Sequence, residues 1–293
     1  MKAVLAFLLL LGSLAVSYGN GRGQMSLSGR GPPSRPPTRP PIRPRPHPVR
    51  AWNCREGPRL YGARQIDAGM GKVVVSDSRR QTFFLSAVAW YRLGRTSMKH
   101  VSVGAGGLWG CSHANKVYKY VAGDFKLANG LSMYQVDAGG DGQIVGVGQR
   151  NYNTYCLREK TALGYCGRGA LRWTFLSRRM MYYSCGPMWG CWGVDKSFRI
   201  WVTKNISPTS CGTSGWAVVP GPRMRMIEVS SDGKVFGVTT TGKIYQRTGI
   251  SNGRRQGTGW VYVPMCMPVR HVSYDLCNLW IVTTSGLVMK CSH

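Results

Sequence analysis

The chain is 293 residues long and carries 39 lysines and arginines against 11 aspartates and glutamates, a formal net charge of +28. An excess of this size favours anionic partners at long range and makes their binding depend strongly on salt. No apolar run beyond the N-terminus reaches the ~18 residues of a membrane span, which excludes a multi-spanning membrane protein.

Residues 1–19 have the pattern of a secretory signal peptide. Lys2 precedes an apolar run from Ala3 to Val16, and small residues follow at Ser17 and Gly19. The run is too short for a membrane anchor, so we expect a secreted, extracellular protein whose compartment permits disulfides. This location argues against nucleic acid as a partner and favours anionic glycans, lipopolysaccharide, phospholipid surfaces or sulfated polymers. The alternative is that the charge serves only solubility.

Residues 20–51 form a Pro/Arg-rich arm that is expected to be disordered. Residues 20–50 hold seven arginines, nine prolines and no acidic residue. Frequent proline blocks helix and sheet pairing and favours an extended polyproline II path of ~3.1 Å per residue. Arginines along such an arm can pair bidentately with sulfate, phosphate or carboxylate groups, and a simple spacer is the alternative.

From Trp52 onward the sequence repeats six times. The copies open on aromatic residues spaced 38, 35, 48, 43 and 44 residues apart: Trp52, Trp90, Phe125, Trp173, Trp216 and Trp260. Within each copy, short β-type runs alternate with glycine-based turns, as in Met226–Val229, Val235–Thr239 and Lys243–Arg247. Four short strands make an antiparallel meander that cannot bury both faces alone and therefore needs its copies.

Repeats of about 40–45 residues with four strands each are typical of the blades of a β-propeller. Helical periodicity is absent, which excludes an α-solenoid, and a parallel β-helix would have shorter coils. We therefore predict an all-β, six-bladed β-propeller over residues 52–293. The predicted blades are 52–88, 89–123, 124–171, 172–214, 215–258 and 259–293.

All ten cysteines fall within the repeats. Cys54 follows the first aromatic opener and Cys291 follows the last strand, so a bridge between them would close the ring and contribute about 4–5 kcal/mol. The other predicted pairs are Cys156–Cys166, Cys185–Cys191 and Cys211–Cys266. Cys111 and Cys277 have no evident partner, and spacing alone leaves other pairings open.

One register of the predicted innermost strand alternates acidic residues with serines around the ring. The six residues are Asp67, Ser102, Asp137, Ser184, Glu228 and Ser273. Facing a channel, they would make a site for a hard cation, with Asp67, Asp137 and Glu228 as the charged ligands. Alternatively, each side chain caps backbone amides of the neighbouring blade.

Sugars are held by aromatic faces against their C–H surfaces, together with a few fixed hydrogen bonds. The tryptophans that open the copies are expected to pack between blades: Trp90, Trp173, Trp216 and Trp260. Tyrosines recur on the last strand of three copies beside basic residues. These candidates for sugar or anion binding are Tyr118, Tyr155 and Tyr245, with Lys116, Lys119, Lys243 and Arg247.

Several short motifs are distributed over the copies. They include Trp52-Asn-Cys54, Trp109-Gly-Cys111, Tyr182-Tyr-Ser-Cys-Gly-Pro187, Ile227-Glu-Val-Ser-Ser-Asp-Gly233 and His271-Val-Ser-Tyr-Asp-Leu276. Together they resemble the fish-egg lectins of the tectonin-repeat group over Trp52–His293. The resemblance implies a secreted propeller lectin that binds N-acetylglucosamine-type or lipopolysaccharide glycans, and also bound calcium and homo-oligomers. Copies 1 and 3 depart from the family pattern, for instance at Phe125.

The sequence contains no metalloprotease, P-loop or nucleophile-elbow motif and no paired-carboxylate constellation, so we expect a protein that is not an enzyme and requires no cofactor. Our interpretation is a lectin of egg or innate defence whose partners are glycans and anionic polymers. The alternative is a disulfide-linked basic matrix protein of an egg envelope or a mineralised layer.

Overall fold

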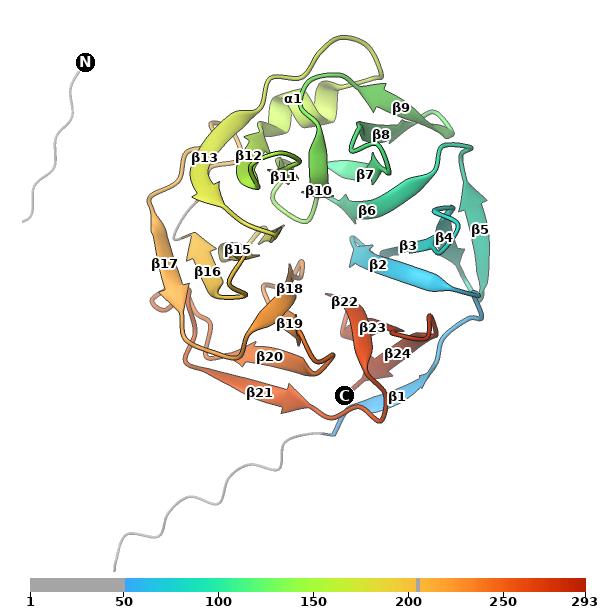
Figure 1. The fold of residues 1–293 in the computed structure, drawn as a ribbon, viewed down its shortest axis with the longest axis vertical. Helices are drawn as coiled ribbons and strands as arrows, with labels where there is room; N and C mark the ends of the chain where they lie inside the picture. Colours follow the sequence, from blue (N-terminus) through green and yellow to red (C-terminus); the bar gives the residue numbers. More distant parts are fainter. Residues whose placement is uncertain (1–50, 204–205) are drawn as a thin grey trace, which may run out of the picture. The chain divides into compact units, whose positions relative to one another are not determined.

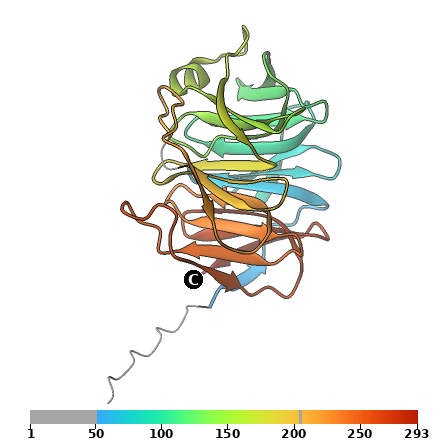
Figure 2. The ribbon, with the colours of Figure 1, turned by 60° about the vertical axis from the view of Figure 1, so that its left-hand side comes forward.

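The computed structural model describes residues 51–203 and 206–293; the predicted signal peptide (1–19) and residues 20–50 of the predicted arm lie outside the described residues. Within them, the strands form six four-stranded antiparallel sheets arranged as blades around a central axis (Figure 1). Turned by 60°, the blades lie one beside the next, with their connecting loops on both sides (Figure 2). The predicted all-β class and the six-bladed β-propeller are confirmed.

Each blade is numbered here from the strand at the axis outward. Blade 1 is β2 (Ala63–Gly69), β3 (Lys72–Asp77), β4 (Thr82–Ser86) and β5 (Ala89–Leu93). Blade 2 is β6 (Met98–Gly104), β7 (Gly107–Ser112), β8 (Val117–Val121) and β9 (Asp124–Ala128). Blade 3 is β10 (Met133–Asp137), β11 (Ile144–Gly148), β12 (Asn153–Leu157) and β13 (Thr174–Arg179), with α1 (Glu159–Gly164) between the last two.

The second half of the ring follows the same order. Blade 4 is β14 (Tyr182–Gly186), β15 (Gly190–Val194), β16 (Ile200–Thr203) and β17 (Trp216–Val219). Blade 5 is β18 (Met224–Val229), β19 (Val235–Thr239), β20 (Ile244–Thr248) and β21 (Gly259–Val263). Blade 6 is β22 (Val269–Asp275), β23 (Asn278–Thr283), β24 (Val288–Ser292) and β1 (Asn53–Glu56), so it joins the two ends of the described chain.

The predicted blade boundaries are displaced by one strand from the sheets. The aromatic residue that opens each predicted copy lies on, or next to, the outer strand of the preceding blade. Trp90, for example, is on β5 and pairs with Leu85 of β4 across a tight turn. A cyclic repeat has no marked beginning in the sequence, so only the closure of the ring fixes where one blade ends.

Outer-strand tryptophans link neighbouring blades at the rim, as expected. The indole N–H groups of Trp90, Trp216 and Trp260 donate to backbone carbonyls of the preceding blade, at Pro58, Leu176 and Pro220. The N···O distances are 2.8, 3.2 and 3.1 Å. These rings therefore serve the fold and are not free to receive a ligand with their polar edge.

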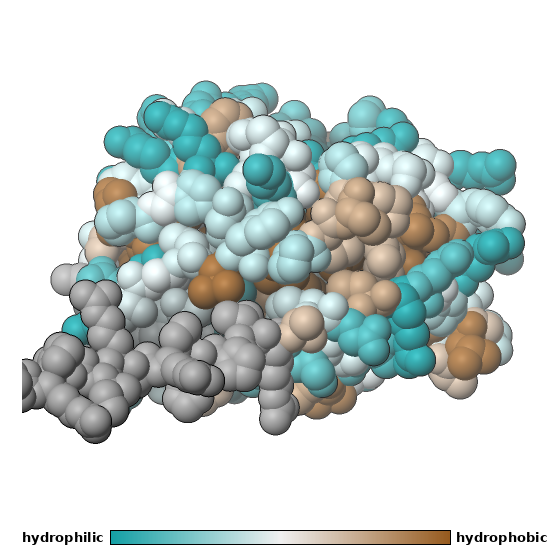
Figure 3. Space-filling view, turned by 90° about the horizontal axis from the view of Figure 1, so that it is seen from below, coloured by the Kyte–Doolittle hydropathy of each residue, from teal (hydrophilic) through white to brown (hydrophobic). Residues whose placement is uncertain are grey.

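The apolar core lies between blades. In five blades the inner strand begins with a buried apolar residue: Ala63, Met98, Met133, Met224 and Val269. In blade 4 the buried Met180 lies two residues before β14. Gly104 at the end of β6 approaches blade 3 so closely that a Cβ would lie 2.0 Å from the Ala138 carbonyl oxygen. The edge of the ring that lies lowest in Figure 1 is largely hydrophilic, with apolar patches between the polar side chains (Figure 3).

One turn in every blade is bonded to the next blade. The turn between the second and third strands contains a residue with positive φ. Its carbonyl accepts a hydrogen bond from an N–H at, or two residues before, the start of the next inner strand. The acceptors are Arg80, Asn115, Tyr152, Phe198, Gly242 and Gly286, and the donors are Met98, Met133, Met180, Met224, Val269 and Ala63. All six N···O distances lie between 2.8 and 3.1 Å.

The ring is closed by both hydrogen bonds and a covalent bond. β1 pairs antiparallel with β24, which places Cys54 directly opposite Cys291. The two cysteines form a disulfide across 237 residues of sequence. The predicted ring-closing bridge is confirmed.

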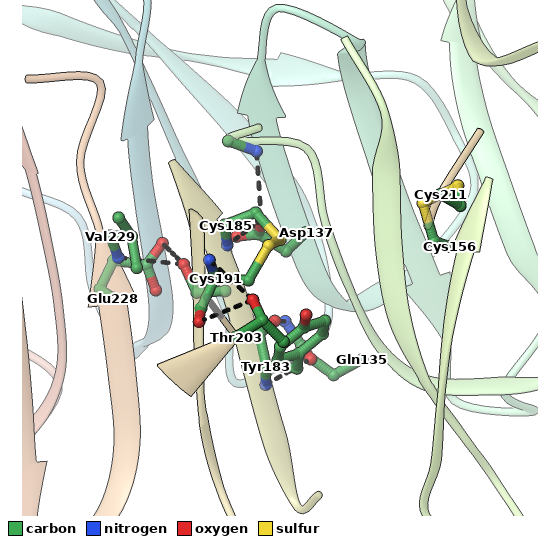
Figure 4. Close-up of a disulfide and its surroundings, with 12 residues drawn as sticks. Gln135, Asp137, Cys156, Tyr183, Cys185, Cys191, Thr203, Cys211, Glu228 and Val229 are labelled. Carbon is green, nitrogen blue, oxygen red and sulfur yellow. Dashed lines mark hydrogen bonds between the residues drawn. A yellow bond between two sulfur atoms is a disulfide. The ribbon is translucent and has the colours of Figure 1, made fainter. Parts of the chain in front are cut away.

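The remaining cysteines differ in part from expectation. Cys185–Cys191 bridges β14 to β15 as predicted (Figure 4). The predicted pairs Cys156–Cys166 and Cys211–Cys266 are wrong, because Cys156 is bonded to Cys211. Both of these cysteines are buried in one apolar cluster between blades 3 and 4, whereas Cys166 and Cys266 are exposed. Cys277 is also exposed and unpaired, and Cys111 is buried and unpaired.

Cys54→Ser should destabilise the ring more than any change at a free thiol. Losing a cross-link of this span removes about 5 kcal/mol of constraint on the unfolded chain, which corresponds to a Tm lower by roughly 10 °C or more. Differential scanning calorimetry of the two variants Cys54→Ser and Cys277→Ser tests this, since Cys277 is an exposed free thiol. Equal Tm values for both variants would contradict a closing role for the bridge.

Candidate ligand-binding site

The alternating ring of acidic residues and serines lies on the six inner strands, and all six side chains are buried. At five junctions between described blades, the side chain accepts a hydrogen bond from a backbone N–H of the next blade. The donors and acceptors are Val103 to Asp67, Ala138 to Ser102, Cys185 to Asp137 (Figure 4), Val229 to Ser184 and Ala68 to Ser273, at 2.6–3.0 Å. The ring therefore caps amides of neighbouring blades.

Glu228 is the exception in this ring. Its two carboxyl oxygens accept hydrogen bonds from the Ser184 and Tyr182 hydroxyls, each at 3.3 Å. The Tyr182 hydroxyl also contacts Nε2 of His271 at 2.9 Å and Nε2 of His100 at 3.2 Å. This network crosses the axis and joins blades 2, 4, 5 and 6.

The ring does not fit the calcium ion that the family resemblance implied. Burial raises the pKa of the Asp67 carboxyl to about 6, against hydrogen bonds from Val103 and the ring serines that lower it. Burial, followed by the charge of Asp67, also raises the pKa values of Asp137 and Glu228. A hard cation needs several carboxylate oxygens directed at one point. Both oxygens of Asp67 and both oxygens of Glu228 already accept hydrogen bonds from neighbouring blades. Among the described residues, no group of three or more His, Cys, Asp or Glu side chains is arranged to hold a metal ion.

The axis also lacks room for a sugar. The space beside Asp67, Glu228 and Gly139 has a volume of about 30 Å³. That is enough for a water molecule, whereas small-ligand sites measure about 300–1,000 Å³. Ligand binding is therefore to be sought outside the axis.

The three candidate tyrosines share one register on the third strands of blades 2, 3 and 5. Tyr118, Tyr155 and Tyr245 are each half-buried and each lies opposite a glycine of the second strand: Gly110, Gly146 and Gly237. At each glycine, the space that a side chain would need is taken by the methionine at the start of the inner strand: Met98, Met133 and Met224. The tyrosines lie on separate blades and so would serve separate sites.

Two of these tyrosines are paired with exposed aromatic residues of the adjacent outer strand. Tyr155 lies 5.8 Å from Phe175 and Tyr245 lies 5.5 Å from Tyr262, measured between ring centroids. Tyr155 also lines a groove of about 320 Å³ together with Asn153. Aromatic surface beside polar groups is the chemistry that holds the face of a sugar.

The predicted basic partners divide into two kinds. Lys116 and Lys243 are exposed and each precedes its tyrosine by two residues. Arg247 is buried, donates to the Gln256 carbonyl at 2.7 Å and lies 5.2 Å from the Trp260 ring centroid. Arg247 thus holds the loop after β20 instead of facing a ligand. Lys119 is likewise buried and donates to three carbonyls at the end of α1.

The corresponding register of blade 4 holds Trp201, which the tyrosine pattern missed. Trp201 lies opposite Gly193, and Arg199 precedes it by two residues, as Lys243 precedes Tyr245. This spacing of a basic residue and an aromatic residue is the sequence signal by which Trp201 could have been found. Trp201 lines a groove of about 510 Å³ between β13 of blade 3 and the turn before β16.

These features define a class of protein: a closed propeller whose axis is filled and whose half-buried aromatic residues recur at one register of the third strands. The sequence matches the tectonin domain family over residues 62–284. The chain belongs to that family.

Over 159 residues the chain is 40% identical to the fish-egg lectin of Cyprinus carpio. The matched part is 54% of this chain and 65% of the carp protein, just under two thirds of that relative's length.

Solved structures of other propellers share the fold. A gluconolactonase from Xanthomonas campestris superposes with a TM-score of 0.57 at 12% identity, covering 80% of this chain and 87% of that one. Virginiamycin B lyase from Staphylococcus aureus gives 0.53 at 13% identity, covering 83% and 99%. At such low identity the likeness shows the fold alone.

Asp67→Asn should remove the destabilisation that arises when the buried Asp67 carboxyl ionises. Because the folded pKa of about 6 is above the ordinary value of 3.8, the contribution of Asp67 to stability is complete below pH 3.8 and is lost as the pH rises through 6. Relative to wild type, the variant should gain about 2 kcal/mol in free energy of unfolding between pH 4 and pH 7. Chemical denaturation at several pH values measures this difference.

Ser76→Ala provides the control, because Ser76 is a buried hydroxyl bonded to the Lys99 carbonyl and does not ionise. Its difference from wild type should be the same at every pH. A difference for Asp67→Asn that is equally flat would show that the carboxyl is ionised in the ring at acidic pH.

Proposed function

We propose that this chain is a secreted carbohydrate-binding protein, a lectin, that recognises N-acetylglucosamine-type or lipopolysaccharide glycans on microbial or egg surfaces. The observation that carries the proposal is the recurrence of a half-buried aromatic residue two positions after an exposed cation, at one register of three blades. The three pairs are Lys116 with Tyr118, Arg199 with Trp201 and Lys243 with Tyr245. The identity to a fish-egg lectin supports the same function.

Because the aromatic–cation pairs repeat on one ring, several of them can bind the same glycan surface at once. A single aromatic–cation pair binds a sugar weakly, because only one sugar face and a few polar groups are engaged. Several such sites on one ring engage a repetitive glycan surface together and gain a factor of ~10²–10⁴ in avidity. The net charge of +28 adds long-range attraction to acidic surfaces. Such multivalent capture suits egg or innate defence.

The proposed activity is binding without catalysis and without a resident metal. The carboxyl groups at the axis are occupied by amides and hydroxyls, so they have no part in the sites at the blade junctions. Sugar binding is therefore expected to persist when divalent cations are removed.

A structural matrix protein is the second candidate, favoured by one observation. Cys166, Cys266 and Cys277 are exposed and unpaired in the described structure. In an oxidising compartment such thiols form bridges between chains, which would yield disulfide-linked homo-oligomers.

No helix among the described residues is long and apolar enough to cross a membrane.

If the protein is a lectin, it should be retained on immobilised N-acetylglucosamine and eluted by the free sugar, in 150 mM salt as well as at low salt. A chelator in the buffer should leave retention unchanged, for the reason given above. Elution volumes with and without competing sugar are the measurement. Passage through the column at every salt concentration, combined with material that dissolves only in reductant, would contradict the lectin and favour the matrix protein.

Tyr245→Ala should lower agglutination of glycan-coated particles by roughly tenfold, because one of a few avidity-linked sites is lost. Tyr61→Ala is the matched control: Tyr61 is 79% exposed but lies outside the shared register. The titre is measured for both variants after equal Tm has been established. If Tyr245→Ala keeps the wild-type titre, blade 5 contains no working site.

A further inference from the structure

The groove at Trp201 differs from its counterparts in the charge that surrounds it. Its wall on the blade 3 side is the outer strand β13, and its other wall is the turn and strand that follow β15 in blade 4. Four cationic side chains line it, with a single carboxylate: Arg178, Arg179, Lys196 and Arg199, with Asp195. The formal charge of the lining is therefore +3.

The one carboxylate is fully used within the turn. Asp195 accepts hydrogen bonds from the backbone N–H groups of Ser197 and Arg199, at 2.8 and 3.0 Å. Its other oxygen accepts from Nε of Arg199 and Nε1 of Trp201, both at 2.8 Å. Although burial raises the pKa of Asp195, the hydrogen bonds from Trp201, Arg199 and Ser197 outweigh it and hold the pKa below its ordinary value. Asp195 thus orients Arg199 and Trp201 and leaves the other cations unpaired.

Arg178 is held in place by an aromatic ring instead of a carboxylate. Its guanidinium carbon lies 3.4 Å from the centroid of Trp201, in stacking contact. Among the described residues it has no ion-pair partner, and burial together with the nearby Arg199 lowers its pKa. A stacked guanidinium keeps its N–H edge free, and that edge matches the oxygens of a sulfate or phosphate group.

The backbone is shaped to present this arginine. Ser177, inside β13, has a φ of +56°, and the pairing of β12 with β13 shifts register between Asn153 and Tyr155. A bulge of this kind redirects the side chains next to it and is common beside binding sites. Arg178 follows Ser177 directly, and its ring contact spans from blade 3 to blade 4.

The rest of the groove suits a sugar ring. Phe175, which is 51% exposed, lines it together with the polar residues Asn153, Ser177 and Ser197. A volume of about 510 Å³ lies within the range of about 300–1,000 Å³ for small-ligand sites. Aromatic surface, neutral polar groups and unpaired cations are thus present together.

We propose that this groove binds a sulfate or phosphate ester carried on a saccharide, with the ester on Arg178 and Arg199 and the sugar ring toward Phe175. The proposal rests on the carbohydrate-binding function proposed above and names the ligand class of one of its sites. Blades 2 and 5, with one exposed lysine beside the tyrosine, are left to less acidic sugars.

The test is calorimetric titration of the full protein with four probes: N-acetylglucosamine, its 6-sulfate, its 6-phosphate and inorganic sulfate. Wild type should bind at least one ester roughly tenfold or more tightly than the unmodified sugar, since charge-assisted bonds are added. The two esters distinguish a sulfated from a phosphorylated natural ligand. Arg178→Gln should lower the affinity for the esters to that for N-acetylglucosamine, with both affinities measured on the same variant.

Two further variants separate a fitted site from general charge. Arg178→Lys keeps the charge but loses the planar pair of donors, so it should retain only part of the preference. Arg92→Gln makes the same charge change on the outer strand of blade 1, where Arg92 is exposed, and should leave the preference intact. The Tm of each variant is measured to exclude unfolding.

Several outcomes would overturn the proposal. If the esters and the unmodified sugar bind equally tightly, the proposed ester site is wrong while the lectin function stands. If Arg92→Gln and Arg178→Gln lose the preference for the esters equally, the preference comes from net charge and not from this groove. Binding of inorganic sulfate as tight as that of the esters would show an anion site without a saccharide. If none of the three saccharides binds, the lectin function fails as well.

Discussion

The structure depends on a hydrogen bond that is repeated at each of the six blade junctions of the described ring. The carbonyl of a turn residue with positive φ accepts from an N–H at the start of the next inner strand, within 3.1 Å. This bond sets the height and rotation of each blade against its neighbour. Because all six junctions share it, residues at one register of the chain arrive at one level of the ring. The buried polar ring at the axis and the aromatic register on the third strands both follow from that constraint.

The same constraint explains why binding is directed outward. Capping the amides of neighbouring blades occupies Asp67, Asp137 and their ring partners, and Gly104 lets the blades approach until no channel of useful size is left. Buried polar groups with satisfied hydrogen bonds stabilise one arrangement, but they have no capacity left for a ligand. The rim between an outer strand and the next blade's turn is where side chains remain free.

Much of the fold was predictable from the sequence, because strand-and-turn periodicity at about 40 residues and the terminal cysteines are local signals. The strand at which each blade begins was not predictable, since no local signal shows that the strand at Trp90 pairs with the strand before it and so ends a blade. The partner of Cys156 depended on which loop is buried beside it, and spacing favoured the exposed Cys166 over the buried Cys211. Arg247 and Arg199 likewise look alike in sequence, yet one is buried under Trp260 and the other lines a groove.

Charge and selectivity are separate properties in this protein. A net charge of +28 attracts any acidic surface and chiefly raises the rate of encounter, which salt suppresses. Selectivity needs cations whose positions are fixed before the ligand arrives, since ordering a flexible side chain costs about 0.5–1.5 kcal/mol. Arg178, stacked on Trp201, and Arg199, held by Asp195, meet that condition, whereas an exposed lysine such as Lys116 does not. The six blades therefore share a four-stranded sheet but differ in the side chains that they present. The junction of blades 3 and 4 is where an acidic glycan would be distinguished from a neutral one.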